Sequence, residues 1–227
     1  MKKILILLLS TVVYWQGNSQ EADTQRPKRI DKLMQMVGDE NAWRTAKGFH
    51  MLEIANVSRY KLPLVREFWI DFEQPRIKMT SKSAELHEIR ALNVDHGWTM
   101  GNEEVTPWEE RTVNGFRSFW PGIPTRIFHL IATNDPSLSY EIKEDRIIFY
   151  IDREFVVWIA TDPEGNPVAY GRSNNHAETH FLGEMLTYGP VRLWKEAVEP
   201  GGQWGVLMVD YQLLSTLSNV SYSQPKD

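Results

Sequence analysis

Alternation between apolar and polar residues is the feature that most constrains the fold of this chain. Period-two segments, typical of strands with one buried face, occupy residues 50–60, 62–72, 76–79 and 86–94. Between the last of these and residues 98–100, Asp95, His96 and Gly97 form a turn that tolerates a positive φ. Consecutive hairpins of this kind predict an antiparallel meander rather than the parallel sheet of a nucleotide-binding fold.

The same alternation of apolar and polar residues occurs in the second half of the chain. Further strands are predicted at residues 138–142, 146–152, 154–161, 168–172, 180–188 and 204–217. Residues 162–167, Asp-Pro-Glu-Gly-Asn-Pro, form a strong turn between two of these strands. The sequence contains neither a glycine-rich phosphate loop nor the lysine that accompanies it.

Two stretches favour helices instead of strands. Near the start, helical spacing relates Ile30, Leu33, Met34 and Val37. Gly38 is placed to end this helix, and residues 39–41 can cap a short second helix around Ala42 and Trp43. In the middle, the insert 114–133 interrupts the strands, and Pro124 is suited to begin a helix that runs to about Ala132.

The order of these elements predicts an α+β fold. We expect a strongly curved antiparallel sheet, an incomplete β-barrel of about ten strands, with helices covering its concave face. No linker-like segment divides the chain, so residues 20–227 are predicted to form a single domain.

Composition excludes several classes of function. The 25 Lys and Arg residues against 30 Asp and Glu give a net charge of −5, which argues against a nucleic-acid partner. The chain has no cysteine, so it can form neither disulfides nor thiol-ligated metal sites. A serine-hydrolase elbow of the form Gly-x-Ser-x-Gly is also absent from the sequence. We therefore predict a protein that is not an enzyme and uses no cofactor.

The first nineteen residues have the pattern of a secretory signal peptide. Lys2 and Lys3 precede a short apolar run, and the small polar residues 17–19 precede Gln20. Cleavage is expected between Ser19 and Gln20, which would export the mature chain to the periplasm as a soluble protein. The run is short for a membrane span, so an uncleaved anchor is the minor alternative.

Several soft motifs in this order resemble the periplasmic lipoprotein-carrier superfamily, the LolA-like proteins. They are the amphipathic helix that ends at Gly38, Trp43, the strands carrying residues 68–71 and 75–79, the turn 95–98, the hydrophobic insert and the hairpin 162–167. The resemblance implies a half-open barrel whose lidded hollow holds acyl chains. It also implies an arginine at the barrel mouth, for which Arg59, Arg66, Arg76 and Arg90 are all eligible. No lipobox cysteine follows the signal, so the membrane-anchored form is not implied.

Aromatic and aliphatic residues are the candidates for lining such a hollow, because acyl chains need a broad apolar wall. The predicted ligand-binding residues are Trp69, Trp98, Trp120, Ile127, Phe128, Ile131, Phe149 and Trp158. Packed core is the alternative interpretation of each. His176 and His180 have a carboxylate between them, but in an extended segment they would be too far apart to share zinc, so no metal site is predicted.

The hypothesis drawn from the sequence is an exported soluble carrier or sensor. It would bind a lipid, an acylated peptide or a lipoprotein in an apolar cavity under a helical lid. The alternative is a non-enzymatic envelope module with a filled barrel that binds a protein partner through a strand edge or the concave rim. Neither reading requires an integral membrane protein.

Overall fold

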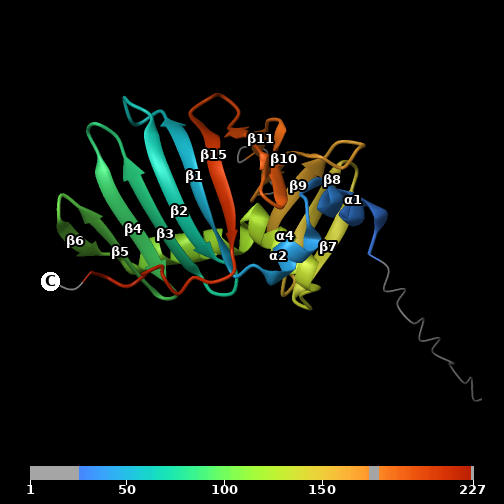
Figure 1. Ribbon diagram of the computed structural model, residues 1–227, viewed down its shortest axis with the longest axis horizontal. Helices are drawn as coiled ribbons and strands as arrows, with labels where there is room; N and C mark the ends of the chain where they lie inside the picture. Colours follow the sequence, from blue (N-terminus) through green and yellow to red (C-terminus); the bar gives the residue numbers. More distant parts are fainter. Residues whose placement is uncertain (1–25, 174–178, 226–227) are drawn as a thin grey trace, which may run out of the picture.

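The computed structural model describes residues 26–173 and 179–225. The predicted signal peptide, residues 1–19, therefore lies outside the described part. The described residues form a 13-stranded sheet in the order β6-β5-β4-β3-β2-β1-β15-β14-β11-β10-β9-β8-β7 and a two-stranded sheet of β12 and β13 (Figure 1). The first six strands are β1 Gly48–Val57, β2 Leu64–Asp71, β3 Arg76–Lys82, β4 His87–Asn93, β5 His96–Gly101 and β6 Glu104–Pro107. The others are β7 Leu138–Lys143, β8 Arg146–Ile151, β9 Glu154–Thr161, β10 Pro167–Gly171, β11 Thr179–Leu182, β12 Met185–Tyr188, β13 Val191–Trp194, β14 Glu196–Val198 and β15 Trp204–Leu214.

The sheet is curved, antiparallel and open, which confirms the predicted fold class. Strands β1 to β6 run outward to one edge, and the chain then crosses to the opposite edge at β7. From β7 the strands return until β15 pairs with β1 in the middle of the sheet. The sheet has more strands than the roughly ten predicted. The short strands β6 and β14 of this sheet were not predicted. The single predicted strand 180–188 is instead β11 of this sheet and β12 of the two-stranded sheet, separated at Gly183.

The N-terminal helices follow the predicted pattern. Helix α1 (Lys28–Met36) buries Ile30, Leu33 and Met34. Gly38 has φ +103, and a Cβ there would meet the Pro190 carbonyl oxygen at 2.7 Å, so only glycine fits between α1 and the next element. Helix α2 (Glu40–Thr45) then begins with Asp39, whose side chain accepts a hydrogen bond from the Asn41 backbone N–H at 2.8 Å.

The crossing from β6 to β7 is helical. It consists of α3 (Glu110–Phe119), a short 3-10 turn η1 (Trp120–Gly122) and α4 (Pro124–Thr133). In Figure 1 these helices run behind the strands from the β6 edge toward β7. Pro124 occupies the first turn of α4, and Asn134 in the left-handed conformation, φ 51, ends it. The predicted helix 124–132 is thus confirmed to within one residue.

Helix α4 lies within the hydrophobic core. Nine of its ten residues, all of them described, are buried, and Phe128 is fully inaccessible. The Phe128 ring meets Trp43 of α2 edge to face, with ring centroids 5.4 Å apart. His129 donates a hydrogen bond from Nδ1 to the Trp43 carbonyl oxygen at 2.8 Å. Since imidazole nitrogen meets a carbonyl oxygen only as a donor, Nδ1 carries the hydrogen, and the contact fixes α4 to α2.

Candidate functional site

A cavity of about 640 Å³ lies between the concave face of the sheet and helix α3. Its volume falls within the range of about 300–1,000 Å³ that is usual for small-molecule sites. The strands β1 to β4, β10, β11, β14 and β15 contribute to one side, and α3, η1 and the start of α4 contribute to the other.

Strand register arranges the sheet side of the cavity in three rows. The deepest row is apolar and contains Phe49, Ile70 and Ile77, which are paired across β1, β2 and β3. Two residues along each strand, the next row contains Met51, Phe68, Met79 and Arg90. The outer row contains Glu53 paired with Arg66. Polarity therefore increases along the strands from one end of the cavity to the other.

The outer row contains a buried ion pair. Glu53 is only 4% exposed, and Arg66 donates a hydrogen bond from its NH2 group to the Glu53 carboxylate. Burial raises the pKa of Glu53, while the positive charge of Arg66 opposes that rise. A buried pair of this kind costs desolvation that its attraction does not always recover, so its presence at the cavity wall calls for a functional explanation.

The part of the sheet side formed by β10, β11 and the end of β14 is aromatic with charged groups beside it. The Tyr170 ring stacks on His180 with centroids 4.6 Å apart, and His180 Nε2 lies 3.7 Å from Glu199. Burial raises the pKa of Tyr170 to about 12. Smaller effects on that pKa come from the charges of Arg172, Glu53, Glu199 and Arg66. Charged groups from both halves of the sheet thus lie close enough to the Tyr170 hydroxyl to affect its pKa.

Helix α3 covers the cavity with one face. Thr112, Gly115, Phe116 and Phe119, spaced as i, i+3, i+4 and i+7, line the cavity. Within α3, all of whose residues are described, Val113 alone is buried. The helix is held from outside by Trp108, whose ring lies 4.5 Å from that of Phe116, and by the guanidinium of Arg172, 4.1 Å from the Phe119 ring centroid. Few side chains therefore fix α3 in place.

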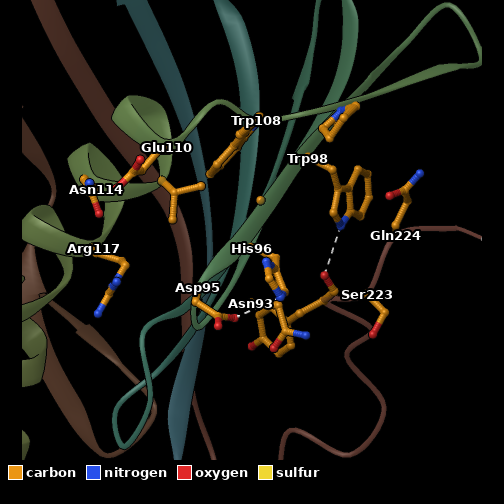
Figure 2. A pocket seen from close by; sticks show the side chains of 14 residues that line it. Asn93, Asp95, His96, Trp98, Trp108, Glu110, Asn114, Arg117, Ser223 and Gln224 are labelled. Atoms are coloured by element: carbon orange, nitrogen blue, oxygen red, sulfur yellow. Dashed lines mark hydrogen bonds and ion pairs between the residues drawn. The ribbon is translucent and has the colours of Figure 1, made fainter.

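The opposite face of α3 lines a second hollow of about 730 Å³ (Figure 2). Glu110, Asn114 and Arg117 project from the helix toward it. The indoles of Trp98 and Trp108 and the C-terminal segment form other parts of its wall, and Trp98 Nε1 donates to the Tyr222 carbonyl oxygen at 3.0 Å. This lining is more polar than that of the 640 Å³ cavity, because it includes the amide or charged side chains Asn93, Asp95, Glu110, Asn114, Arg117 and Gln224, so the hollow suits an acyl chain less well.

The eight predicted ligand-binding residues, all of them described, lie outside the lining of the 640 Å³ cavity. Trp98 lines the second hollow, Trp69 stacks on His50 with centroids 5.0 Å apart, and Trp158 belongs to a small separate cluster. The five that share the main core are Trp120, Ile127, Phe128, Ile131 and Phe149. Their contact with a ligand stays a prediction.

The alternation of side chains between the two faces of a strand explains why some predicted residues do not line the cavity. Phe68 and Ile70 of β2 line the cavity, so Trp69 between them points to the other face of the sheet. Trp158 likewise lies between the core residues Val157 and Ile159. In both strands apolar residues occupy both faces, and the sequence offers no signal for choosing the concave one.

Three of the four candidates for the arginine at the barrel mouth lie at the cavity. Arg59, Arg66 and Arg90 line the cavity. Arg76 instead lies 3.6 Å from the Asp71 carboxylate. Within the described ranges, no three metal-binding side chains gather in a way that could hold an ion. The His176 of the rejected zinc motif lies outside those ranges.

No model of a known protein family matches the chain, and no curated protein matches it. Among solved structures, the chain is similar to a LolA superfamily protein from Nitrosomonas europaea, with a TM-score of 0.46, 9% identity, and 86% of this chain and 96% of that chain covered. A domain assigned as an outer membrane lipoprotein-sorting protein from Vibrio parahaemolyticus has a TM-score of 0.37, 7% identity, and coverage of 83% and 94%. For a DUF1329 family protein from Desulfovibrio piger the values are 0.42, 8%, 86% and 95%.

Proposed function

We propose that the protein is a carrier or sensor that binds the acyl chain of a lipid, an acylated peptide or a lipoprotein. The supporting observation is the cavity of about 640 Å³, whose inner rows present Phe49, Met51, Phe68 and Ile70 to empty space. Apolar walls of this kind gain about 25 cal/mol for each Å² that a ligand removes from water, before the costs of ordering. Among the described residues of the lining, none is a nucleophile activated by a base, and the proposed role is binding without catalysis.

Helix α3 is the part of the cover that we expect to move. Opening the cavity through α4 would expose Ile127 and Phe128, which are fully buried. Displacing α3 exposes little more than Val113 and the partly buried Phe116. Since the cost of opening grows with the apolar area exposed, α3 gives the cheaper route for a ligand.

An envelope module that binds a protein partner is the second candidate. The observation favouring it is that the sheet ends in two edge strands, β6 and β7, within the described chain. An unpaired edge offers backbone hydrogen-bonding groups to another strand. This candidate needs no ligand in the cavity, so the two functions differ in what copurifies with the protein.

Export is part of the proposal and depends on the N-terminal sequence pattern. Among residues 26–173 and 179–225, no helix is long and apolar enough to cross a bilayer. We expect N-terminal sequencing of the protein from its native host to begin at or near Gln20, with the protein in the periplasmic fraction. Recovery of an intact Met1 from washed membranes would contradict both expectations.

Direct ligand detection tests the carrier. Native mass spectrometry of protein purified from its own envelope should show a bound species of lipid mass. Titration with a fluorescent fatty acid should show saturable binding to the delipidated protein. A folded protein that carries no lipid and binds no acyl probe would reject the carrier and favour the protein-interaction module.

A further inference from the structure

The charge of the cavity differs in sign from that of the chain. The full sequence carries a net charge of −5. The cavity lining nevertheless contains four arginines, Arg59, Arg66, Arg90 and Arg172, against two glutamates, Glu53 and Glu199. Low-dielectric walls strengthen such a local excess of one charge, so the cavity attracts anions although the protein as a whole repels them.

Arg66 lies at the polar end of the cavity, in the outer row opposite Glu53. Arg90 lies one row deeper, in the middle row opposite Met79. Arg59 follows β1 in the turn toward β2 and is exposed, and Arg172 follows β10 in the other half of the sheet. The apolar row of Phe49, Ile70 and Ile77 occupies the opposite end.

One of these arginines, Arg66, has a nitrogen that the described residues leave without a partner. Arg66 binds Glu53 through its NH2 group, but its Nε is buried and meets no hydrogen-bond partner in the described chain. Arg90 is paired with the Glu88 carboxylate, with Nε 2.8 Å from one oxygen and the NH2 group donating to the other at 3.1 Å, and Glu88 is not among the residues lining the cavity. Buried donors without partners are rare in folded proteins, and they indicate a group that a ligand completes.

We propose that the cavity binds an amphiphile with an anionic head, a carboxylate or a phosphate, held between Arg66, Arg90 and the flanking arginines. This inference rests on the proposed function and adds the chemical class of the head. The chain of the amphiphile lies along the apolar rows, and its head reaches the open end. Guanidinium groups bind carboxylate and phosphate through paired, charge-assisted hydrogen bonds, which a neutral or cationic head cannot form.

Probes that share one chain and differ in the head test this inference. The wild-type protein is titrated with palmitate, hexadecyl phosphate, hexadecanol and hexadecyltrimethylammonium, each displacing the same fluorescent probe below its critical micelle concentration. We expect the two anionic probes to bind about tenfold or more tighter than the alcohol, and the cation to bind most weakly. The preference should shrink as salt is added, because the exposed Arg59 is screened.

Substitutions separate the head site from the chain site. Arg59→Gln and Arg90→Gln, singly and together, should lower the affinity for the anionic probes about tenfold and leave that of hexadecanol unchanged. Arg66 is kept, because its removal would leave Glu53 buried without a partner. Arg117→Gln is the matched control, since Arg117 lies on the face of α3 that lines the second hollow. It should leave all four affinities unchanged.

The outcomes distinguish the two proposals. Equal binding of all four probes, or an anionic preference that survives in the double variant, overturns the anionic head site while leaving the acyl cavity intact. Failure of every probe to bind the folded protein overturns the proposed function itself. If the head site holds, the ratio between palmitate and hexadecyl phosphate identifies whether a fatty acid or a phosphate-bearing lipid is preferred.

Discussion

Replacing Gly115 with tryptophan is expected to abolish saturable acyl-probe binding while leaving the protein folded. Gly115 lies on the cavity face of α3, and a Cβ added there would meet no atom within 4 Å. The indole therefore has space to extend over the apolar rows that the acyl chain would occupy. Glycine is about 0.5–1 kcal/mol less favourable than ordinary residues inside a helix, so the substitution should not lower the free energy of unfolding.

A matched control makes this result specific. Gly101 in β5 also has no atom within 4 Å of an added Cβ, and it is not among the residues lining the cavity. The Gly101→Trp variant should bind the fluorescent fatty acid as the wild type does. Gly115→Ala should also bind, because a methyl group fills little of the cavity. Unchanged binding by Gly115→Trp would show that ligand, if bound at all, lies outside this cavity.

The arrangement of the strands could be predicted because each hairpin is encoded locally. Alternation places β1 to β4 close to the predicted positions, and the turn at residues 162–167 separates β9 from β10 as expected. Short edge or linking strands were missed. The strand β14, Glu196–Val198, has only three residues, too few for an alternating pattern to be recognised.

Only the second half of α3 falls within the predicted insert 114–133, and its start at Glu110 was missed for a different reason. Its sequence Glu110–Phe119 contains Thr112, Val113 and Gly115, which have low helix propensity, and it buries one residue. Helix α4 was easier to delimit because Pro124 marks its first turn and a dense apolar run follows.

The charged end of the cavity could not be predicted from single positions. Glu53 and Arg66 are 13 residues apart and meet only because the hairpin pairs β1 with β2 in that register. A shift by one residue would turn both side chains to the other face of the sheet. Ion pairs across a sheet thus depend on loop length and strand register. The alternating pattern does not predict either of these with single-residue precision.

The largest loss of stability is expected from Phe128→Ala. Phe128 is completely inaccessible and packs against Trp43 in the main core. Truncation removes the buried ring and leaves a cavity, which costs about 3–5 kcal/mol in well-packed cores. Against a typical free energy of unfolding of about 5–15 kcal/mol, such a loss brings the protein near its unfolding threshold. Urea denaturation followed by tryptophan fluorescence measures this change.

Binding by the same variant decides between the two interpretations of Phe128. If the ring is core, protein that remains folded at low temperature should keep its affinity for the fluorescent fatty acid, because Phe128 does not line the cavity. Phe119→Ala should behave in the reverse way, since Phe119 lines the cavity and is 37% exposed. That substitution should weaken acyl binding and cost less than about 1 kcal/mol, as is usual for half-exposed side chains. Loss of binding with full stability in Phe128→Ala would instead place Phe128 against the ligand, as the sequence had suggested, and would shift the moving cover from α3 to α4.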